Sequence, residues 1–211
     1  MNDAVASRHD LHPVPTSEGR RTRLLIMGPQ GSGKGSQAKR LAQDLGVLTI
    51  STGEIFRKNI AEGTELGKLA QEYTNRGELV PDEVTDKMVR DRLGEPDLAG
   101  GFILDGYPRN AAQVVALDET LAVLGFELDG VIELVVPDDV LRARIAKRTA
   151  EEGREDDNEE TIARRLAIYA SETEPLLATY GERGLRVRSD AVGNVEEVND
   201  KILAAMAEQL G

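Results

Sequence analysis

The chain has 211 residues, of which 40% are hydrophobic and 30% are charged, so it is typical of a globular domain and not of a disordered protein. Its formal net charge of −12 argues against a broad nucleic-acid-binding surface, and its lack of cysteine excludes a disulfide framework and a cysteine-based zinc site. No apolar run approaches the roughly 20 residues needed to cross a bilayer, so we expect a cytoplasmic protein with no membrane partner.

Residues 1–21 differ in character from the rest of the chain. They are polar, contain two prolines and show no hydrophobic periodicity. They also lack the apolar stretch of a secretory signal, so we expect a flexible tail. The folded domain is therefore expected over residues 22–211.

Short apolar runs alternate with runs of helical spacing along this domain. The short runs predict strands at residues 23–27, 47–50, 102–104, 131–136 and 185–187. The helical spacing predicts helices at 38–45, 111–124, 138–149, 157–180 and 195–210, and a helical stretch at 51–93 broken at Gly63, Gly77 and Pro81. The alternation predicts an α/β fold of three layers, in which helices flank a five-stranded parallel sheet.

One helix start is placed by a local signal. A polar segment covers residues 150–158, and within it Asp157 has the three-residue spacing to Glu160 that is typical of a capping box. We therefore expect the helix at 157–180 to begin at this aspartate.

The turn after the first strand has the sequence GPQGSGKGS at residues 28–36, which matches G-x-x-x-x-G-K between a strand and a helix. Its glycines allow successive backbone N–H groups to surround phosphate oxygens, and Lys34 adds a positive charge. The hydroxyl expected directly after the lysine arrives one position later, at Ser36, because Gly35 intervenes. The motif predicts nucleotide binding but not a reaction, and a glycine-rich turn without a ligand is the alternative.

Asp105 follows the third predicted strand, at the edge where open α/β sheets bind their ligands. A carboxylate beside a phosphate-binding turn can hold Mg²⁺ through water, and Ser36 is a possible second ligand. The alternative is that Asp105 only forms a turn or caps a helix. We expect Mg²⁺ to accompany ATP, and we expect no zinc.

Further motifs follow in a fixed order along the chain. They are ISTGEIFR at 50–57, GELVPDE at 77–83, DGYPRNAAQ at 105–113, RIAKR at 144–148 and GREDDNEETIARRL at 153–166. With the glycine-rich turn, this series resembles the adenylate kinase family from about residue 23 to the C-terminus. The resemblance implies a monomeric P-loop nucleoside monophosphate kinase that transfers a phosphoryl group directly and in line from Mg-ATP to AMP, giving two ADP.

The resemblance also assigns residues to the two substrates. The ATP-binding residues are Gly31, Ser32, Gly33, Lys34, Gly35, Ser36, Arg144, Arg148 and Gly193. The AMP-binding residues are Thr52, Arg57, Glu78, Leu79, Val80, Gly106, Tyr107, Pro108, Arg109, Gln113, Arg154 and Arg165. The residues implied to be catalytic are Lys34, Arg109, Arg148, Arg154 and Arg165.

The residue types suit this chemistry. Phosphoryl transfer depends on positioning and charge neutralisation, and the planar guanidinium group binds phosphate oxygens through two hydrogen bonds while it stays charged. An acidic protein that binds anions must concentrate such cations locally. The alternative for any of these arginines is a surface ion pair, and we expect that role for Arg142, Lys147 and Arg164, which match no site of the family.

Two positions bear on the choice of nucleotide. The related uridylate–cytidylate kinases carry Ala in place of Thr52 and Asn in place of Gln113, and a glutamine amide can both donate and accept at the edge of adenine. A uridylate–cytidylate kinase, another small-molecule kinase of this fold and a non-catalytic module that senses ATP or AMP are the alternatives. Gln30, Glu54 and Tyr107 replace the Pro, Asp and Phe common in the family, and we expect them to tune activity without abolishing it.

Two segments are expected to move. The stretch between Arg148 and Asn158 is too short for a β-rich lid domain, so the chain resembles the short-lid form of the family. Its lid is expected at about residues 148–158, over ATP, and its AMP-binding segment at about 51–80. Closure of both would exclude water and limit wasteful hydrolysis of ATP.

Overall fold

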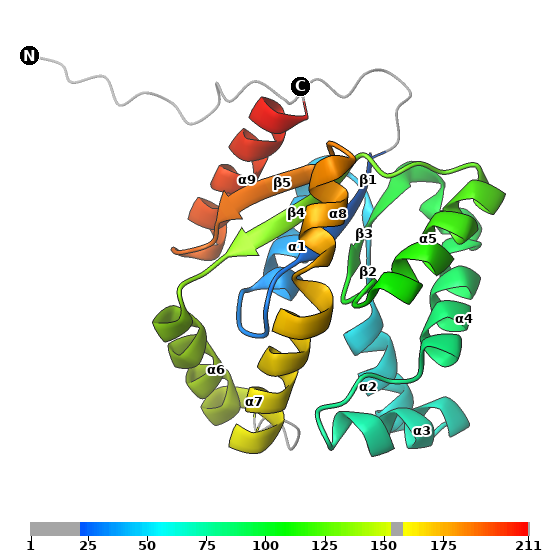
Figure 1. The fold of residues 1–211 in the computed structure, drawn as a ribbon, viewed down its shortest axis with the longest axis vertical. Helices are drawn as coiled ribbons and strands as arrows, with labels where there is room; N and C mark the ends of the chain where they lie inside the picture. The colour runs from blue at the N-terminus through cyan, green and yellow to red at the C-terminus, as the bar shows by residue number, and fades with distance from the viewer. Residues whose placement is uncertain (1–21, 153–157, 211) are drawn as a thin grey trace, which may run out of the picture.

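The computed structural model describes residues 22–152 and 158–210, and within them a parallel five-stranded sheet forms the centre of the molecule (Figure 1). The strands are β1 (Thr22–Met27), β2 (Leu48–Ser51), β3 (Gly101–Asp105), β4 (Gly130–Val135) and β5 (Arg186–Asp190), in the order β2-β3-β1-β4-β5. The sheet and its flanking helices confirm the predicted fold class. The tail predicted at residues 1–21 and the predicted site residue Arg154 lie outside the described residues.

Helices connect the strands and cover the sheet. They are α1 (Lys34–Leu45), α2 (Thr52–Glu62), α3 (Glu65–Thr74), α4 (Asp82–Leu93), α5 (Ala111–Leu124), α6 (Asp138–Glu152), α7 (Glu159–Ile168), α8 (Leu176–Glu182) and α9 (Val195–Gln209), with a 3₁₀ turn at Pro96–Gly100. The predicted breaks at Gly63, Gly77 and Pro81 fall in the gaps between α2, α3 and α4. No helix in the described ranges is long and apolar enough to cross a membrane.

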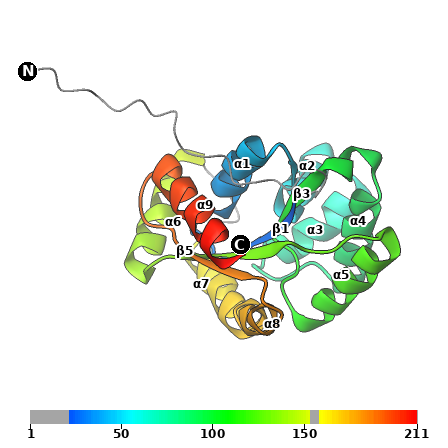
Figure 2. The same cartoon turned by 90° about the horizontal axis from the view of Figure 1, so that it is seen from above.

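The side chains of β1 alternate between two hydrophobic clusters, one on each face of the sheet. Leu24 and Ile26 pack with residues of α1 and α9, whereas Leu25 and Met27 pack with residues of α4, α5 and α8. Figure 2 shows α1 and α9 on one side of the sheet and α5 and α8 on the other. All four side chains are buried, as the near-continuous apolar runs of a parallel sheet predict.

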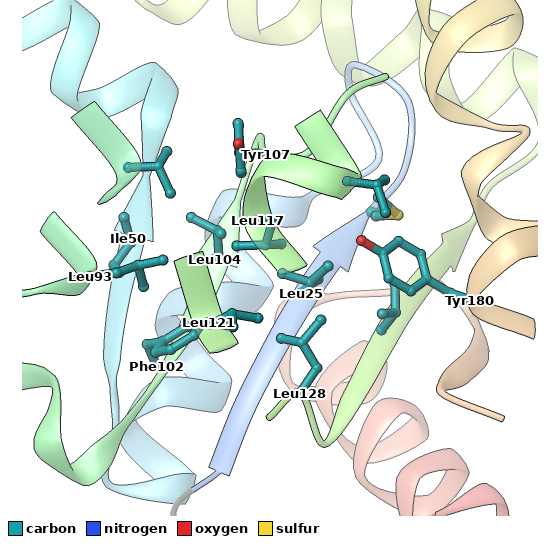
Figure 3. Close-up of a cluster of buried hydrophobic side chains, with 14 of the residues drawn as sticks. Leu25, Ile50, Leu93, Phe102, Leu104, Tyr107, Leu117, Leu121, Leu128 and Tyr180 are labelled. Atoms are coloured by element: carbon teal, nitrogen blue, oxygen red, sulfur yellow. The ribbon is translucent and has the colours of Figure 1, made fainter. Parts of the chain in front are cut away.

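Figure 3 shows the cluster on the side of the sheet covered by α5 and α8, where aliphatic side chains such as Leu104 and Leu117 lie between Phe102 and Tyr180. A third, smaller cluster lies away from the sheet and joins Phe56 of α2, Ala70 of α3 and Val80 before α4. These helices therefore have a packing core of their own, as a segment that closes over a substrate would need.

The helix predicted at 157–180 is interrupted, which corrects that prediction. Helix α7 gives way to a π turn at Tyr169–Thr173, where the Glu174 N–H donates to the Tyr169 carbonyl at 2.8 Å, five residues back. Pro175 has no N–H to continue the ladder, so the chain restarts as α8.

The predicted ends of the neighbouring elements also shift. The structure caps α7 with Asn158, whose Oδ1 accepts a hydrogen bond from the Thr161 N–H at 2.9 Å, so the prediction that the helix begins at Asp157 is wrong. Helix α6 continues to Glu152, three residues beyond its predicted end, so the first part of the expected polar segment is helical. Alanine and glutamate are good helix formers, which explains this extension.

Candidate active site

A cavity of about 890 Å³ lies at the carboxyl ends of β1, β2 and β3. Strand pairing brings these ends together, because Asp105 of β3 pairs with Ile26 of β1 on one side and with Ser51 of β2 on the other. The cavity is lined by Gly31, Ser32, Gly33, Lys34, Gly35, Ser36, Thr52, Arg57, Glu78, Leu79, Val80, Asp105, Gly106, Tyr107, Pro108, Arg109, Gln113, Arg144, Arg148, Arg165 and Gly193. These are all the predicted site residues that the structure describes; Arg154 lies outside the described ranges, and the role of each residue stays a prediction.

The glycine-rich turn between β1 and α1 requires glycine for its conformation and for its packing. Gly31 and Gly33 have φ values of 85° and 94°, which residues with a side chain rarely adopt. A Cβ on Gly31 would also lie 2.8 Å from Cγ1 of Ile145 on α6. The residue that precedes α1, Gly33, has no side chain with which to cap the helix, so the first N–H groups of α1 are available to a phosphate.

Lys34 is held at the floor of this turn. Its Nζ donates hydrogen bonds to the carbonyl oxygens of Gly28, at 2.7 Å, and Pro29, at 2.9 Å. Burial lowers the pKa of Lys34 to about 8, and the charge of Asp105 offsets only part of that effect. Ser32 Oγ is also buried, without a hydrogen-bond partner in the described part of the chain. A buried ammonium that rests on neutral carbonyls gains strongly from an anionic ligand.

Asp105 and Ser36 fit a magnesium ion that arrives with a nucleotide. Asp105 is buried at the end of β3, where its Oδ2 accepts a hydrogen bond from Ser51 Oγ at 3.3 Å and lies 3.8 Å from the position of a Cβ on Gly35. The carboxylate therefore faces the start of α1, next to Ser36. Such oxygens bind Mg²⁺ when water and phosphate complete its shell. Among the described residues, no three His, Cys, Asp or Glu side chains form a metal site by themselves.

Arginine side chains also converge around Arg109 in this cavity. Arg109 is partly buried, and burial is the main reason its pKa is lowered; the nearby charges of Arg165 and Arg57 lower it further, whereas Asp105 raises it. Its Nε donates to the Gly106 carbonyl at 2.7 Å, which fixes the guanidinium group in place. The positive charges of Arg57, Arg109 and Arg165 repel one another, and a phosphate between them would relieve the repulsion.

Thr52 and Gln113 lie beside these arginines. Thr52, the first residue of α2, is buried and donates from Oγ1 to the Gly106 carbonyl at 3.0 Å. Gln113, in the first turn of α5, accepts at Oε1 from the Arg109 N–H at 2.8 Å and donates from Nε2 to Asp82 Oδ1 at 2.7 Å. Both side chains are thus fixed by protein groups before any ligand binds.

Arg144 connects the glycine-rich turn to the loop between β5 and α9. Its Nη1 donates to the Ser32 carbonyl at 3.3 Å, and its Nη2 donates to the carbonyls of Ala191, at 2.9 Å, and Gly193, at 3.3 Å. Arg148 lies one turn further along α6 and lines the same cavity. This part of the site therefore combines the glycine-rich turn, α6 and Gly193, which is one of the predicted ATP-binding residues.

The sequence gives no role to several side chains that hold the loop at 106–110. Asp82 lies in the GELVPDE motif, yet nothing in that motif indicates its contact with Gln113. Thr173 donates from Oγ1 to the Arg109 carbonyl at 2.7 Å, and the sequence gives no signal for it because the π turn was not expected. Tyr107 donates from its hydroxyl to Asp86 Oδ1 at 2.6 Å, a bond that the phenylalanine common at this position cannot make.

Arg164, expected to form a surface ion pair, does so: its Nη2 lies 2.7 Å from Glu78 Oε1. The partner was not expected, since Glu78 belongs to the predicted AMP-binding segment. Next to it, Arg165 donates from Nη2 to the Thr74 carbonyl at 3.1 Å. Helix α7 thus contacts the segment that is expected to close over AMP.

Comparison with known proteins gives one consistent result. A family model described as adenylate kinase matches residues 26–185. An adenylate kinase of Thermobifida fusca is 53% identical over 87% of this chain and 97% of its own length, and one of Bifidobacterium longum is 56% identical over 86% and 98%. An adenylate kinase of Kocuria rhizophila is 51% identical over 88% of this chain and 98% of its own length.

Proposed function

The chain belongs to the adenylate kinase family, and we propose that the cavity described above is where it carries out the reaction of that family. The reaction is the reversible transfer of a phosphoryl group from Mg-ATP to AMP, which gives two ADP. One observation carries the assignment of the site: Lys34 and Arg109, both largely buried, lie in one cavity with four further arginines and the glycine-rich turn. An acidic chain concentrates its cations in this way where a polyanion binds.

ATP is proposed to bind on the side of the glycine-rich turn. The backbone N–H groups from Gly31 to Ser36 would surround its phosphates, Lys34 would neutralise them, and Arg144 and Arg148 would approach from α6. The loop at Gly193 would contact the adenine. Asp105 and Ser36 would hold the Mg²⁺ that accompanies ATP, which neutralises charge on the phosphates.

AMP is proposed to bind on the side of α2 and the loop at 106–110. Arg57, Arg109 and Arg165 would hold its phosphate, because their guanidinium groups already converge there. Thr52 and Gln113 would lie near the base, and the backbone at residues 78–80 would line the pocket around it. Arg154, in the predicted lid, is proposed to complete the set of arginines on the strength of the family resemblance.

These positions support direct, in-line transfer. The phosphate of AMP and the γ-phosphate of ATP would meet between Lys34 and Arg109, and the surrounding arginines would balance the charge on the oxygens during transfer. No side chain needs to accept the phosphoryl group, so no phosphoenzyme is expected. Closure of the segment at about 51–80 and the lid at about 148–158 would keep water from competing with AMP.

Further properties are proposed for the protein as a whole. We expect a monomer that acts in the cytoplasm, needs Mg²⁺ but no zinc, and binds neither nucleic acid nor membrane. The net charge of −12 and the lack of cysteine support the expectations about nucleic acid and zinc. Activity that is lost when a chelator removes all divalent ions, and is fully restored by Mg²⁺ without added zinc, would support the metal assignment.

The decisive test is a coupled assay of ADP formation with AMP, UMP, CMP or GMP as the acceptor. We expect AMP to be preferred. A preference for UMP or CMP would assign the chain to the uridylate–cytidylate kinases. ATP binding without ADP formation from any acceptor would instead support a sensing module.

A further inference from the structure

The amide of Gln113 is held at both ends by protein groups of fixed polarity. The Arg109 backbone N–H can only donate, so it takes the amide oxygen, at 2.8 Å. The Asp82 carboxylate accepts the amide N–H at 2.7 Å. The side chain is 2% exposed, so bulk water cannot replace either partner. Reversing the amide would place its oxygen against the Asp82 carboxylate and its amino group against the Arg109 N–H.

Asp82 is itself fixed in position. It is the first residue of α4, where the helix N-terminus favours a negative charge. Asn110 Nδ2 donates to both of its oxygens, at 3.0 Å and 3.1 Å, and Asn110 Oδ1 in turn accepts from the Gln113 N–H at 2.9 Å. The carboxylate, Asn110 and Gln113 therefore form one closed network at the start of α5.

Gln113 lines the cavity, and this network fixes which hydrogen-bond donor and which acceptor its amide offers there. One N–H and one oxygen lone pair of the amide remain available, in an order that cannot be reversed. Adenine presents an amino donor at position 6 and an acceptor at N1, whereas guanine and hypoxanthine present an acceptor at position 6 and a donor at N1. A fixed amide is complementary to one of these edges, while a freely rotating amide would suit either.

We propose that Asp82 is a positioning residue for acceptor specificity, which keeps the Gln113 amide in the orientation that accepts adenine and rejects 6-oxopurines. The proposal rests on the proposed function, in which Gln113 lies at the base of AMP. Asp82 acts through Gln113 and needs no contact with the substrate. Sites built on hydrogen bonds of fixed polarity discriminate strongly, because the wrong ligand leaves buried polar groups unpaired.

The test is the ratio of kcat/KM for AMP to kcat/KM for IMP in the Asp82→Asn variant. An asparagine can present either its oxygen or its amino group to Gln113, so one of the two constraints is lost. We expect the ratio to fall by about tenfold or more, through a lower KM for IMP and a higher KM for AMP. Unchanged KM for ATP and an unchanged Tm would show that the fold and the donor site are intact. If Asp82→Asn does not fold, Asp82→Ser makes the same comparison, since its hydroxyl also donates or accepts.

Two controls separate this role from a structural one. Asp86 lies one turn further along α4 and bonds Tyr107 of the same loop, so Asp86→Asn should leave the AMP to IMP ratio unchanged. In a Gln113→Ala background, Asp82→Asn should no longer change the ratio, because the residue through which it acts is gone. A ratio that stays constant in Asp82→Asn, or one that falls equally in the Gln113→Ala background, would overturn the proposal. Wild-type protein that forms no ADP from ATP and AMP would instead refute the proposed function.

Discussion

Arg164 of α7 forms an ion pair with Glu78, with 2.7 Å between Nη2 and Oε1, and thereby joins the helix after the predicted lid to the predicted AMP-binding segment. Glu78 is shared, because Arg76 Nε also donates to its Oε2 at 3.0 Å. The adjacent bond from Arg165 to the Thr74 carbonyl joins the same two parts of the chain. Arg164 therefore holds the predicted AMP-binding segment next to Arg165, for which we propose a role in the reaction.

We predict that Arg164→Gln raises the KM for AMP by about two- to fivefold with little change in kcat. Both side chains are partly exposed, and pairs of this kind contribute about 0.2–1 kcal/mol. The pair should therefore help to close the segment without taking part in the chemistry. Steady-state kinetics at low and high salt measure the effect, which should shrink as salt screens the pair.

A double-mutant cycle with Glu78→Gln identifies the cause of the effect. If the ion pair is responsible, the double variant should match either single variant and not their sum. Strictly additive effects would mean that Arg164 acts on AMP binding by another route.

Gly77 is a further point where α7 meets this segment. Its φ is 69°, and a Cβ there would lie 2.9 Å from the Thr161 carbonyl oxygen. Gly63 has nearly the same φ, 66°, but a Cβ there would meet nothing within 4 Å. The two glycines thus have the same backbone requirement and differ in their surroundings.

We predict that Gly63→Ala lowers the free energy of unfolding by about 1 kcal/mol, the cost of a left-handed conformation alone. Gly77→Ala should cost about 1–3 kcal/mol more, because the added methyl group also pushes α7 away. It should also raise the KM for AMP. Urea denaturation of both variants measures the difference, and equal losses of stability would show that α7 does not pack against Gly77 in solution.

Features set by local sequence could be predicted, and features set by packing could not. The strands follow from short apolar runs, and the glycine-rich turn follows from its spacing, because both depend on residues close in the chain. The bond between Gln113 and Asp82 joins residues 31 positions apart, and the bond between Thr173 and Arg109 joins residues 64 apart. Such contacts depend on how α4 and the π turn pack around the loop at 106–110.

Local sequence is also an incomplete guide to where helices begin and end. The spacing of Asp157 and Glu160 suits a capping box, yet Asn158 has the same cap-forming chemistry one residue later and supplies the cap. The π turn at Tyr169–Thr173 interrupts the helix, and the spacing of apolar residues does not indicate this interruption. The alternation of strands and helices predicts a parallel sheet but not the order of its strands. The pairing of β3 with β1 and β2, which the structure shows, is what brings the charged residues of the site into one cavity.

Replacement of Lys34 tests the centre of the proposed site. We predict that Lys34→Met lowers kcat by at least about 10²–10³-fold, since a buried charge that stabilises the transferring phosphoryl group is lost. Lys68→Met is a matched control: Lys68 is exposed on α3 and pairs with Glu65 at 2.6 Å, so its removal should leave kcat unchanged. The coupled assay measures both, with circular dichroism to confirm folding. Near-normal turnover in Lys34→Met would show that the reaction occurs elsewhere.

The lowered pKa of Lys34 predicts how ATP binding depends on pH. In the free enzyme this pKa is lowered to about 8, mainly by burial, so the side chain is charged below pH 8 and neutral above it. Phosphate oxygens favour the charged form, so binding should raise the pKa and take up a proton near pH 8. The phosphates themselves, with a last pKa near 6, are already ionised there. The affinity for ATP should therefore fall by about tenfold between pH 7 and pH 9, as the charged fraction falls.

Isothermal titration calorimetry with a non-hydrolysable ATP analogue tests this, in pairs of buffers that differ in ionisation enthalpy. Wild-type protein should show proton uptake that is largest where the free and bound forms differ most in charge, at and just above pH 8. Lys34→Arg keeps its charge throughout this range, so its affinity, although lower, should be flat between pH 7 and pH 9. If the wild-type affinity is equally flat and no proton is taken up, Lys34 is fully charged in the free enzyme and the contacts with the Gly28 and Pro29 carbonyls outweigh its burial.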